Sequence, residues 1–312
     1  MDLRQLRALT GVADHGTFSA AADALHTVQS NVSTHIARLE RELHTTLVDR
    51  STGRLTEAGD AVVSRARRID GELEAMVADI AALRHEVIGT ARLGMIGTTA
   101  RWLVPQLLHL GAQRHPGLRL EVTEGTSTAL EVPLLAGRLD LVVGTLPVPD
   151  DDLLFAPLFA EDLVLVVGKG DALSRHEEIG LEALAGVPML LPLPGTAFRS
   201  EIDSAAAAAG VQLSVRAEVD GTRLLASLTF DGYGPAVLPA TAVPGYLRDD
   251  WRLVRVRDLP RRSVGIARRR RGLPSAPAKA VHQLVVDLTS FEAGLPPGLH
   301  TLLPPRSSPA QD

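Results

Sequence analysis

Residues 19–56 restrict the fold of this chain more than any other stretch, because two helical segments lie close together and a short hairpin follows them. The first segment is rich in alanine, a strong helix former, and Ser19 is expected to cap its N-terminus. The second segment repeats apolar residues at helical spacings of four, three and four. These residues are Val32, Ile36, Leu39 and Leu43. The hairpin is expected where residues 47–48 and 54–55 flank a turn that contains serine and glycine. An earlier helix would complete the core with Leu3, Leu6, Leu9 and Val12. This order predicts a winged helix-turn-helix.

The polar face of the second helix carries short hydrogen-bonding side chains and an arginine, which suit base edges and phosphates. In a winged helix-turn-helix this helix lies in the major groove, and arginines of the hairpin can contact phosphate. The candidate DNA-binding residues are Ser19, Gln29, Ser30, Asn31, Ser33, Thr34, His35, Arg38, Arg50 and Arg54. The alternative is a three-helix packing unit with no role in DNA binding, because an isolated helix-turn-helix pattern is weak evidence.

After Thr56, a good N-cap, one helical pattern continues to about Ile88 and would be roughly 45 Å long. Its apolar residues alternate at spacings of four and three, which is an a/d seam sustained over nearly four heptads. The seam consists of Val62, Ala66, Ile69, Leu73, Met76, Ile80 and Leu83, and Val87 continues it. Such a seam predicts a linker helix that dimerises with a second copy. The alternative is a helix that packs on the core of its own domain.

From Ala91 onward, short apolar strands alternate with helices, which predicts a parallel sheet with helices on its faces. Strands are expected at 91–96, 118–123, 139–143, 163–167, 189–191, 215–219, 236–238 and 264–267. Helices are expected at 102–114, 126–136, 198–209, 222–230 and 277–291. Residues 294–312 are rich in proline and show no periodicity, so they are expected to form a disordered tail.

Short motifs recur through the first sixty residues, at 1–6, 16–22, 25–26, 29–30, 33, 36, 38–40 and 55–59. Together they resemble the N-terminal signature of the LysR-type transcriptional regulators. Residues 137–143 resemble a second signature of that family, and the resemblance continues to about Phe291. The chain departs from the pattern at Val28, where the family often has Ser or Thr, and at Thr34, where it often has Arg. The details of base readout are therefore not carried over.

The resemblance implies a DNA-binding, sequence-specific transcriptional regulator that responds to a small-molecule effector. The implied parts are a winged helix-turn-helix at 1–60, a linker helix at 61–89, an effector domain at 90–293 and a tail at 294–312. The effector domain would have the two-lobed α/β fold of periplasmic binding proteins, with crossovers near Glu161 and Ser263. Lobe I would comprise about 90–160 and 264–293, and lobe II about 161–263. The family also implies a homodimer or tetramer and contact with RNA polymerase.

In such a fold the ligand binds between the lobes, near the carboxyl ends of strands and the N-termini of helices. Hydroxyl groups beside free backbone N–H groups favour a polar or anionic metabolite. The candidate effector-binding residues are Thr98, Thr99, Thr126, Thr145, Pro194, Thr196 and Arg199. The alternative for each threonine is ordinary helix capping, and the alternative for the arginine is a solvated surface position. Arg223, Phe230 and Tyr233 are weaker candidates for the same pocket.

The amino-acid composition limits the kinds of site and the cellular location that can be expected for this protein. The sequence contains no cysteine, which excludes disulfides, thiol chemistry and thiolate metal sites, and no cofactor or metal is expected. No signal peptide and no run of about 18 apolar residues are found, so a cytoplasmic protein without membrane contact is expected. Residues 1–90 carry ten arginines and no lysine against thirteen acidic residues. DNA contact must therefore rest on local groups of arginines rather than on a long-range positive field.

Three other functions remain as alternatives. A solute-binding protein would share the two-lobed fold but would need no N-terminal module. An enzyme is not expected, because no catalytic constellation is found. A constitutive architectural DNA-binding protein would need no ligand pocket. The arginine run at 268–271 is expected to be exposed charge, with a second DNA or subunit contact as its alternative.

Overall fold

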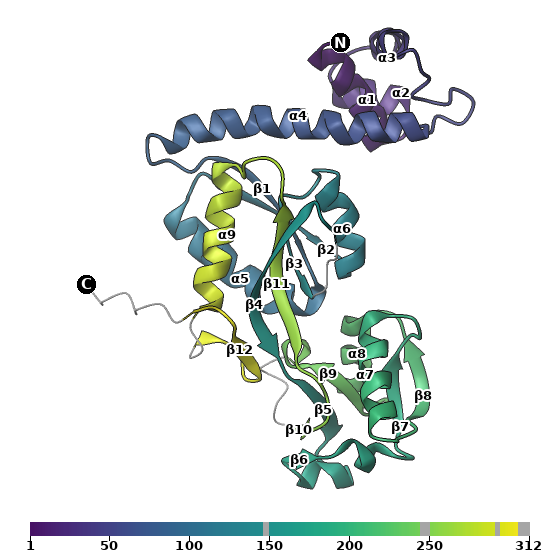
Figure 1. The fold of residues 1–312 in the computed structure, drawn as a ribbon, viewed down its shortest axis with the longest axis vertical. Helices are drawn as coiled ribbons and strands as arrows, with labels where there is room; N and C mark the ends of the chain where they lie inside the picture. The colour runs from purple at the N-terminus through teal and green to yellow at the C-terminus, as the bar shows by residue number, and fades with distance from the viewer. Residues whose placement is uncertain (146–149, 244–249, 291–293, 305–312) are drawn as a thin grey trace.

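The computed structural model describes residues 1–145, 150–243, 250–290 and 294–304 of the 312-residue chain. It shows a small helical module at the N-terminus, a long helix α4, and a two-lobed α/β region (Figure 1). Helix α4 lies across one end of lobe I, and lobe II lies at the opposite end of lobe I. The expected fold class of a winged helix-turn-helix, a linker helix and a two-lobed α/β domain is confirmed.

Three short helices build the N-terminal module around one apolar core. They are α1 (Leu3–His15), α2 (Phe18–Ala24) and α3 (Gln29–Leu43). Asp2 caps α1 by accepting from the Gln5 N–H, while Gln5 Oε1 accepts from the Asp2 N–H, a complete capping box. The prediction that Ser19 caps the next helix is wrong. Thr17 is the cap, because its side chain accepts from the Ala20 N–H, and Ser19 lies inside the first turn.

The apolar stripes of α1 and α3 are buried except at their ends. The expected core residues Leu6, Leu9, Val12, Val32, Ile36 and Leu39 are all buried. Leu3 and Leu43 were expected in the same core but are each 38 % exposed. They lie in the first turn of α1 and the last turn of α3, at the edge of a core too small to cover whole helices. The hairpin is reduced to one antiparallel bridge between Val48 and Leu55.

Helix α4 (Glu57–Ala82) begins at the predicted N-cap, since the Thr56 hydroxyl accepts from the Gly59 N–H at 3.0 Å. It ends six residues before Ile88, and His85 takes a left-handed φ of 62° in the turn that follows. Its 26 residues correspond to about 39 Å of helix, somewhat shorter than predicted.

The seam residues of α4 divide into two groups. Ala66 is buried in the core of the N-terminal module and the partly buried Val62 packs against it, so at these two positions the packing matches the alternative of a helix on the core of its own domain. The farther seam residues Ile69, Met76, Ile80 and Leu83 are exposed, and Leu73 is half-buried. A straight helix drifts about 20° per heptad against a 3.5-residue repeat, so one seam can face the chain's own core at one end and solvent at the other.

Lobe I is built on a six-stranded sheet in the order β12-β4-β11-β3-β1-β2. Its strands are β1 (Gly89–Met95), β2 (Leu118–Glu124), β3 (Leu141–Thr145), β4 (Leu153–Glu161), β11 (Arg262–Arg269) and β12 (Leu299–Thr301). Strand β1 is parallel to β2 and β3, whereas β11, β4 and β12 pair antiparallel. The expectation of a parallel sheet is therefore right for only half of it.

The helices of lobe I are α5 (Gly97–Arg114), α6 (Ser127–Leu135) and α9 (Ala276–Thr289). Helices α5 and α9 share a core cluster with Leu141 of β3, and α6 shares another with the adjacent Val142. Because successive residues of a strand point to opposite faces, α6 covers the face opposite α5 and α9 (Figure 1).

Lobe II contains two smaller sheets, β6-β10-β5-β9 and β7-β8. Their strands are β5 (Leu163–Gly168), β6 (Glu178–Ile179), β7 (Pro188–Pro192), β8 (Ser214–Val219), β9 (Ala236–Pro239) and β10 (Trp251–Val256). Its helices are α7 (Ala197–Ala208) and α8 (Thr222–Phe230), with short 3-10 turns η1 (Ala172–Arg175), η2 (Leu181–Leu184) and η3 (Ala240–Ala242). Phe230 packs edge-on against Trp251 in the core of this lobe, so it is not a pocket wall, and Tyr233 is exposed.

The chain crosses between the lobes directly after β4 and directly before β11. Glu161 at the end of β4 is fully buried, accepts from the Thr241 hydroxyl at 2.6 Å and lies 3.4 Å from Arg262. Arg262 also lies 3.5 Å from Glu201 of α7, and burial raises the pKa of that carboxyl. Two carboxylates thus share one arginine at the junction of the lobes.

The segment after α9 is ordered as far as the structure describes it. Strand β12 pairs with β4, and Leu299 is buried in the core of lobe I. The expected disordered tail is therefore wrong for residues 294–304. Residues 305–312 and Phe291, the expected end of the last helix, lie outside the described residues. None of the described helices is both long and apolar enough to cross a membrane.

Candidate functional site

The N-terminal half of α3 presents polar side chains to solvent. Val28 precedes this helix without a side-chain cap, as expected for valine. The exposed candidates on the helix are Gln29, Ser30, Asn31, Thr34 and Arg38, and Ser33 is half-buried. The opposite face is fixed by Val32, Ile36 and Leu39. The buried stripe therefore turns one polar face outward, as a helix that enters the major groove requires.

Three of the candidate side chains have other neighbours. Asn31 Nδ2 donates to Thr27 Oγ1 at 3.0 Å, and Thr34 Oγ1 donates back to the Ser30 carbonyl at 2.7 Å. His35 is half-buried close to the N-cap residue of α1, and its Nδ1 is buried without a hydrogen-bond partner among the described residues. His35 therefore faces α1, and its predicted contact with DNA is not favoured.

The hairpin is attached to α3 by Glu40, a residue for which the sequence pattern predicts no function. Its Oε1 accepts from the Leu47 N–H at 2.8 Å and from the Val48 N–H at 3.2 Å. Its Oε2 lies 3.7 Å from Arg50 on the hairpin, while Arg50 and Arg54 are both exposed. One carboxylate thus fixes the position of the hairpin arginines relative to α3, and only the tertiary structure could reveal this.

The motif at 55–59 connects the hairpin to α4. The Thr56 hydroxyl donates to the Thr46 carbonyl at 2.8 Å, and the Thr56 N–H donates to the Leu47 carbonyl at 3.0 Å. A Cβ atom on Gly59 would lie 3.1 Å from the Leu47 carbonyl carbon and well inside 3.0 Å of its oxygen. Glycine is therefore required where α4 approaches the backbone of the hairpin.

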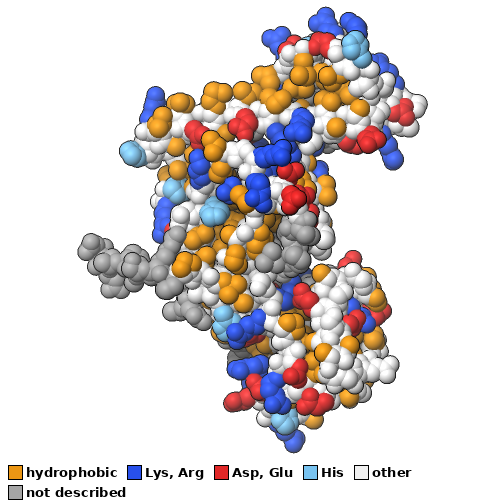
Figure 2. Space-filling view, in the orientation of Figure 1, with side chains coloured by type: hydrophobic (Ala, Val, Ile, Leu, Met, Phe, Trp, Pro, Cys, Tyr) orange, Lys and Arg blue, Asp and Glu red, His pale blue; other side chains and the backbone are white. Residues whose placement is uncertain are grey.

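The charges of the N-terminal module are mixed, as Figure 2 shows on the visible face. Arg7 pairs with Asp70 at 2.9 Å, and Arg67 pairs with Asp14, so both arginines join α1 to α4. In contrast, Arg38 forms no ion pair with any residue that the structure describes. Of the three candidate arginines, Arg38 and Arg54 thus have no acidic partner among the described residues, whereas exposed Arg50 has a weak one in Glu40.

A second candidate site lies where the N-terminus of α5 meets lobe II. Residues 97–100 were expected to be a loop, but they form the first turn of α5, which starts five residues earlier than predicted. Thr98 and Thr99 are buried, and Thr99 Oγ1 has no hydrogen-bond partner among the described residues. Ile96 at the N-cap contributes no side-chain hydrogen bond. The first N–H groups of α5 thus remain uncapped by a side chain at the positive end of the helix dipole.

An ion pair between the lobes lies at this end of α5. Arg223 of α8 donates to Glu124 at the end of β2. A Cβ on Gly97 would lie 2.8 Å from Arg223 Cδ and 2.9 Å from the Glu124 carboxyl carbon. The carboxylate therefore lies at the helix N-terminus. Arg101 of α5 adds a second link by donating to the Ala242 carbonyl of lobe II at 2.7 Å. Glu124 was not among the predicted residues, because its partner lies 99 positions away in the sequence.

The start of α6 and the end of β3 are linked by Ser127. Ser127 Oγ accepts from the Thr145 N–H at 3.0 Å and lies 3.0 Å from the Thr145 hydroxyl. Thr126 caps α6 by accepting from the Ala129 N–H at 3.2 Å. Ordinary capping therefore accounts for Thr126, and Thr145 is tied to the start of α6.

The lobe II candidates are largely occupied by structural contacts. Thr196 caps α7 by accepting from the Arg199 N–H at 3.2 Å, and Pro194 is exposed. The Arg199 guanidinium lies 2.8 Å from Asp203 and 2.8 Å from Glu218, and it also donates to a backbone carbonyl at 2.9 Å. The ligand contact predicted for Arg199 is not favoured by this arrangement, because two carboxylates of lobe II already neutralise its charge.

Comparison with known proteins agrees with this architecture. Residues 3–60 match the family model for the bacterial regulatory helix-turn-helix protein of the lysR family. Residues 84–290 match the model for the LysR substrate binding domain. A probable hydrogen peroxide-inducible genes activator of Streptomyces viridosporus is 36 % identical over 246 residues, which cover 77 % of this chain and 78 % of that protein.

Two solved structures share the fold of nearly the whole chain. A full-length OxyR variant from Pseudomonas aeruginosa superposes with a TM-score of 0.77 at 24 % identity, covering 98 % of this chain and 99 % of that one. Full-length CbnR complexed with its target DNA superposes with a TM-score of 0.66 at 24 % identity, covering 93 % of this chain and 100 % of that one. The two family matches and the Streptomyces relative show that this chain belongs to the LysR family of transcriptional regulators.

Proposed function

We propose that two copies of this chain bind a dyad-symmetric operator and that each inserts α3 into the major groove. The observation that carries this proposal is the orientation of α3, whose buried stripe leaves Gln29, Ser30, Ser33 and Arg38 on the outer side. Arg38 and the hairpin arginines would supply three phosphate contacts per copy. Six contacts per dimer correspond to a slope of about −5 in log K against log salt.

Dimerisation through the second half of α4 is proposed for the same assembly. Met76, Ile80 and Leu83 are 57 %, 57 % and 79 % exposed, and Val77 is 73 % exposed. Hydrophobic side chains along α4 are visible at the surface in Figure 2. Burial of a large apolar side chain contributes about 1.5–3 kcal/mol, so pairing of two such helices would be favourable. A dimer would match a two-fold operator, and a tetramer and contact with RNA polymerase are further expectations for the family.

The effector is proposed to bind where the N-terminus of α5 meets lobe II. The Glu124 carboxylate occupies the position that an anionic ligand would favour, at the positive end of α5 and beside Arg223. A carboxylate-bearing metabolite would replace Glu124 there and could donate a hydrogen bond to the unpartnered Thr99 hydroxyl or accept one from it. Exchange of this ion pair would change the contact between the lobes, because Arg223 and Glu124 belong to different lobes.

Reversible binding, rather than thiol oxidation, is proposed as the signal. The Streptomyces relative is named as a hydrogen peroxide-inducible activator. This sequence contains no cysteine, so no thiolate is available for oxidation to a sulfenic acid or a disulfide. Its regulation must therefore rest on unequal binding of an effector to two arrangements of the protein.

We propose that the protein is a regulator without catalytic activity. It would act in the cytoplasm, where the chromosome lies. The chain belongs to a family of transcriptional regulators. The titratable residues at the junction of the lobes are engaged in ion pairs, as Glu124 and Glu161 illustrate.

The effector site can be tested by thermal melting of the full-length protein with a panel of small carboxylic acids. A true effector at a free concentration of 100 times its Kd should raise the free energy of unfolding by about 2.7 kcal/mol. It should also change the affinity of the protein for its operator. The stabilisation should be lost in Thr99→Val and Arg223→Gln. It should persist in Arg175→Gln, which removes an exposed arginine elsewhere in lobe II. A ligand that stabilises all four proteins equally would place the site elsewhere.

A further inference from the structure

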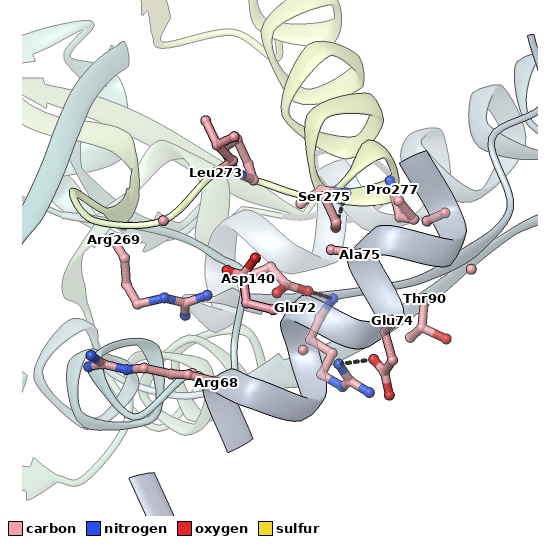
Figure 3. Close-up of a pocket in the computed structure, with 18 of the residues that line it drawn as sticks. Arg68, Glu72, Glu74, Ala75, Thr90, Asp140, Arg269, Leu273, Ser275 and Pro277 are labelled. Atoms are coloured by element: carbon pink, nitrogen blue, oxygen red, sulfur yellow. Dashed lines mark hydrogen bonds and ion pairs between the residues drawn. The ribbon is translucent and has the colours of Figure 1, made fainter. Parts of the chain in front are cut away.

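A cavity of about 710 Å³ lies between α4 and lobe I, away from the junction of the two lobes (Figure 3). One wall is formed by α4 around Ala75. The other wall is formed by the start of β1, the turn after α6, and the segment from the end of β11 to the start of α9. The volume suits a small molecule, because ligand pockets measure roughly 300–1,000 Å³. A ligand in this cavity would touch the linker helix and the effector domain at once.

The charge of the lining is positive. Seven arginines and four acidic side chains line the cavity. Some of the arginines are neutralised: Arg92 lies 3.1 Å from Glu74, and Arg271 lies 3.6 Å from Asp152. Two others, Arg68 and Arg269, form no ion pair within 4.0 Å with any residue that the structure describes.

Arg68 and Arg269 lie beside each other at the C-terminus of α6 (Figure 3). Arg68 donates to the Leu135 carbonyl at 2.5 Å, and Arg269 donates to the Leu134 and Leu139 carbonyls at 2.9 Å and 2.6 Å. These carbonyls at and just after the end of α6 therefore account for the hydrogen bonds of one nitrogen in each guanidinium. They do not account for the rest, because a guanidinium has five N–H donors and Arg68 Nε is buried without a partner among the described residues.

The electrostatic environment of the pair favours an anion. Burial lowers the pKa of Arg269 and is the largest influence on it. The negative charge of Asp140 opposes this, the positive charge of Arg68 acts with it, and Glu72 opposes it more weakly. Burial raises the pKa of the lining residue Asp140, and its Oδ2 is already engaged, since it accepts from the Arg92 N–H at 2.8 Å. Two like charges side by side in a partly buried wall are stabilised by an oxyanion placed between them.

We propose that this cavity is a second ligand site, which binds a compact oxyanion such as a phosphate group through Arg68 and Arg269. The site is independent of the effector position proposed at α5, because the two share no residue. Polar contacts already join α4 to lobe I: Arg68 to the Leu135 carbonyl, Glu74 to Arg92, and Asp79, which accepts from the Ala276 N–H at 3.2 Å. An anion that bridges α4 and lobe I would fix the direction of the helix relative to that lobe and so couple anion binding to the placement of the DNA-binding modules.

Inorganic phosphate, titrated at constant ionic strength with chloride as the reference anion, is the probe for this site. Binding to the full-length protein is measured by calorimetry. Saturable binding is expected for the wild type. Arg269→Gln should weaken it at least about tenfold, as expected when a charge-assisted hydrogen bond is lost. Thr99→Val, at the other site, should bind phosphate as the wild type does.

A second pair of variants leaves the α6 cap intact. Gly71 of α4 lines the cavity, and a side chain added there would meet open space. Gly71→Glu places a carboxylate beside the arginines and should abolish phosphate binding, whereas Gly71→Gln of nearly equal shape should keep the affinity within about twofold. Absence of phosphate binding by the wild type would overturn the proposal. An equal loss of phosphate binding in Gly71→Glu and Gly71→Gln would overturn it as well, and so would an unchanged affinity of Arg269→Gln for phosphate.

Discussion

Replacing Gly59 with alanine sets two effects of opposite sign against each other. In an unconstrained helix interior, Gly→Ala stabilises by about 0.8–1.0 kcal/mol. Gly59 lies in the first turn of α4, where a Cβ would meet the Leu47 carbonyl well inside 3.0 Å and the Leu55 Cβ at 3.3 Å. Neither neighbour can move freely, because Leu47 is buried and its carbonyl accepts from the Thr56 N–H at 3.0 Å.

The structure predicts that the clash is the larger effect. Overpacking of a close-packed site costs about 1–3 kcal/mol. Loss of the Thr56 to Leu47 hydrogen bond adds about 0.5–1.5 kcal/mol. After the helix-propensity gain is subtracted, Gly59→Ala should destabilise the N-terminal module by about 1–3 kcal/mol. For a domain of 60–100 residues this corresponds to a fall in melting temperature of at least about 4 °C.

The matched control is Gly71→Ala in the same helix, where an added Cβ meets open space. It should raise the stability by about 0.5–1 kcal/mol. Calorimetry of the full-length protein measures both changes, and hydrogen exchange over residues 29–60 assigns the transition. Exchange is needed because both tryptophans, Trp102 and Trp251, lie in the two-lobed region. A Gly59→Ala protein as stable as Gly71→Ala would refute the close approach of α4 to the hairpin.

Four further predictions follow from individual contacts. Arg38→Ala should weaken operator binding uniformly across related sequences and reduce the salt slope by about 1 per copy, measured by fluorescence anisotropy, and an unchanged slope would exclude a phosphate contact. Glu40→Ala, which removes the acceptor of the Leu47 and Val48 N–H groups, should raise the hydrogen exchange of the hairpin and weaken operator binding without changing the mass in solution, whereas normal hairpin protection would contradict its anchoring role. Leu73→Asp should convert the dimer to a monomer in sedimentation, because it places an unpaired charge in the seam, and an unchanged mass would show that α4 is not the main interface. Burial raises the pKa of Glu201 in the folded protein. Above that raised pKa the buried carboxylate is ionised and lowers the free energy of unfolding. Below the ordinary value of 4.5 the carboxyl is protonated in both the folded and the unfolded state, so it has no such effect. Glu201→Gln should therefore stabilise the protein at neutral pH, with the difference vanishing as the pH falls below 4.5 in thermal melts, and a pH-independent difference would contradict this.

Helix periodicity and capping allowed much of the N-terminal module to be predicted. The buried stripe of α3 and the cap at Thr56 follow from residue spacing and residue type alone. The cap of α2 was misplaced by two residues, because Thr17 and Ser19 are both good capping residues and only the backbone conformation separates them. The seam of α4 could be predicted as apolar, but spacing alone could not decide that Val62 and Ala66 would pack on the core of the same chain.

The mixed sheet of lobe I was harder to predict than its helices. Strand β4 contains Pro157, and a proline argues against a central strand when only the sequence is available. The structure accommodates it with a register shift between Val264 and Gly265 of β11. Strand β12 follows two prolines, at 296 and 297, and gains its order only by pairing with β4.

Residues of the candidate sites could be named from the sequence where their place at the end of a strand or the start of a helix suggests them. Residues whose contacts are with side chains or backbone far away in the sequence could not. Thr98 and Thr99 follow from their place after the first strand. Glu124 and Glu40 act through tertiary contacts that leave no local pattern. Arg199 had the right charge and position in the sequence, but two acidic neighbours from α7 and β8 neutralise it.

In vitro selection of DNA from a random library by the purified full-length protein tests the central claim most directly. We expect enrichment of one dyad-symmetric site whose half-sites lie one helical turn or a multiple of it apart, about 10–10.5 base pairs per turn. Gln29→Ala, which removes an exposed polar side chain from the outer face of α3, should reduce this enrichment in a parallel selection. Enrichment of asymmetric sequences by a folded dimer, or equal enrichment by both proteins, would contradict the placement of α3 in the major groove.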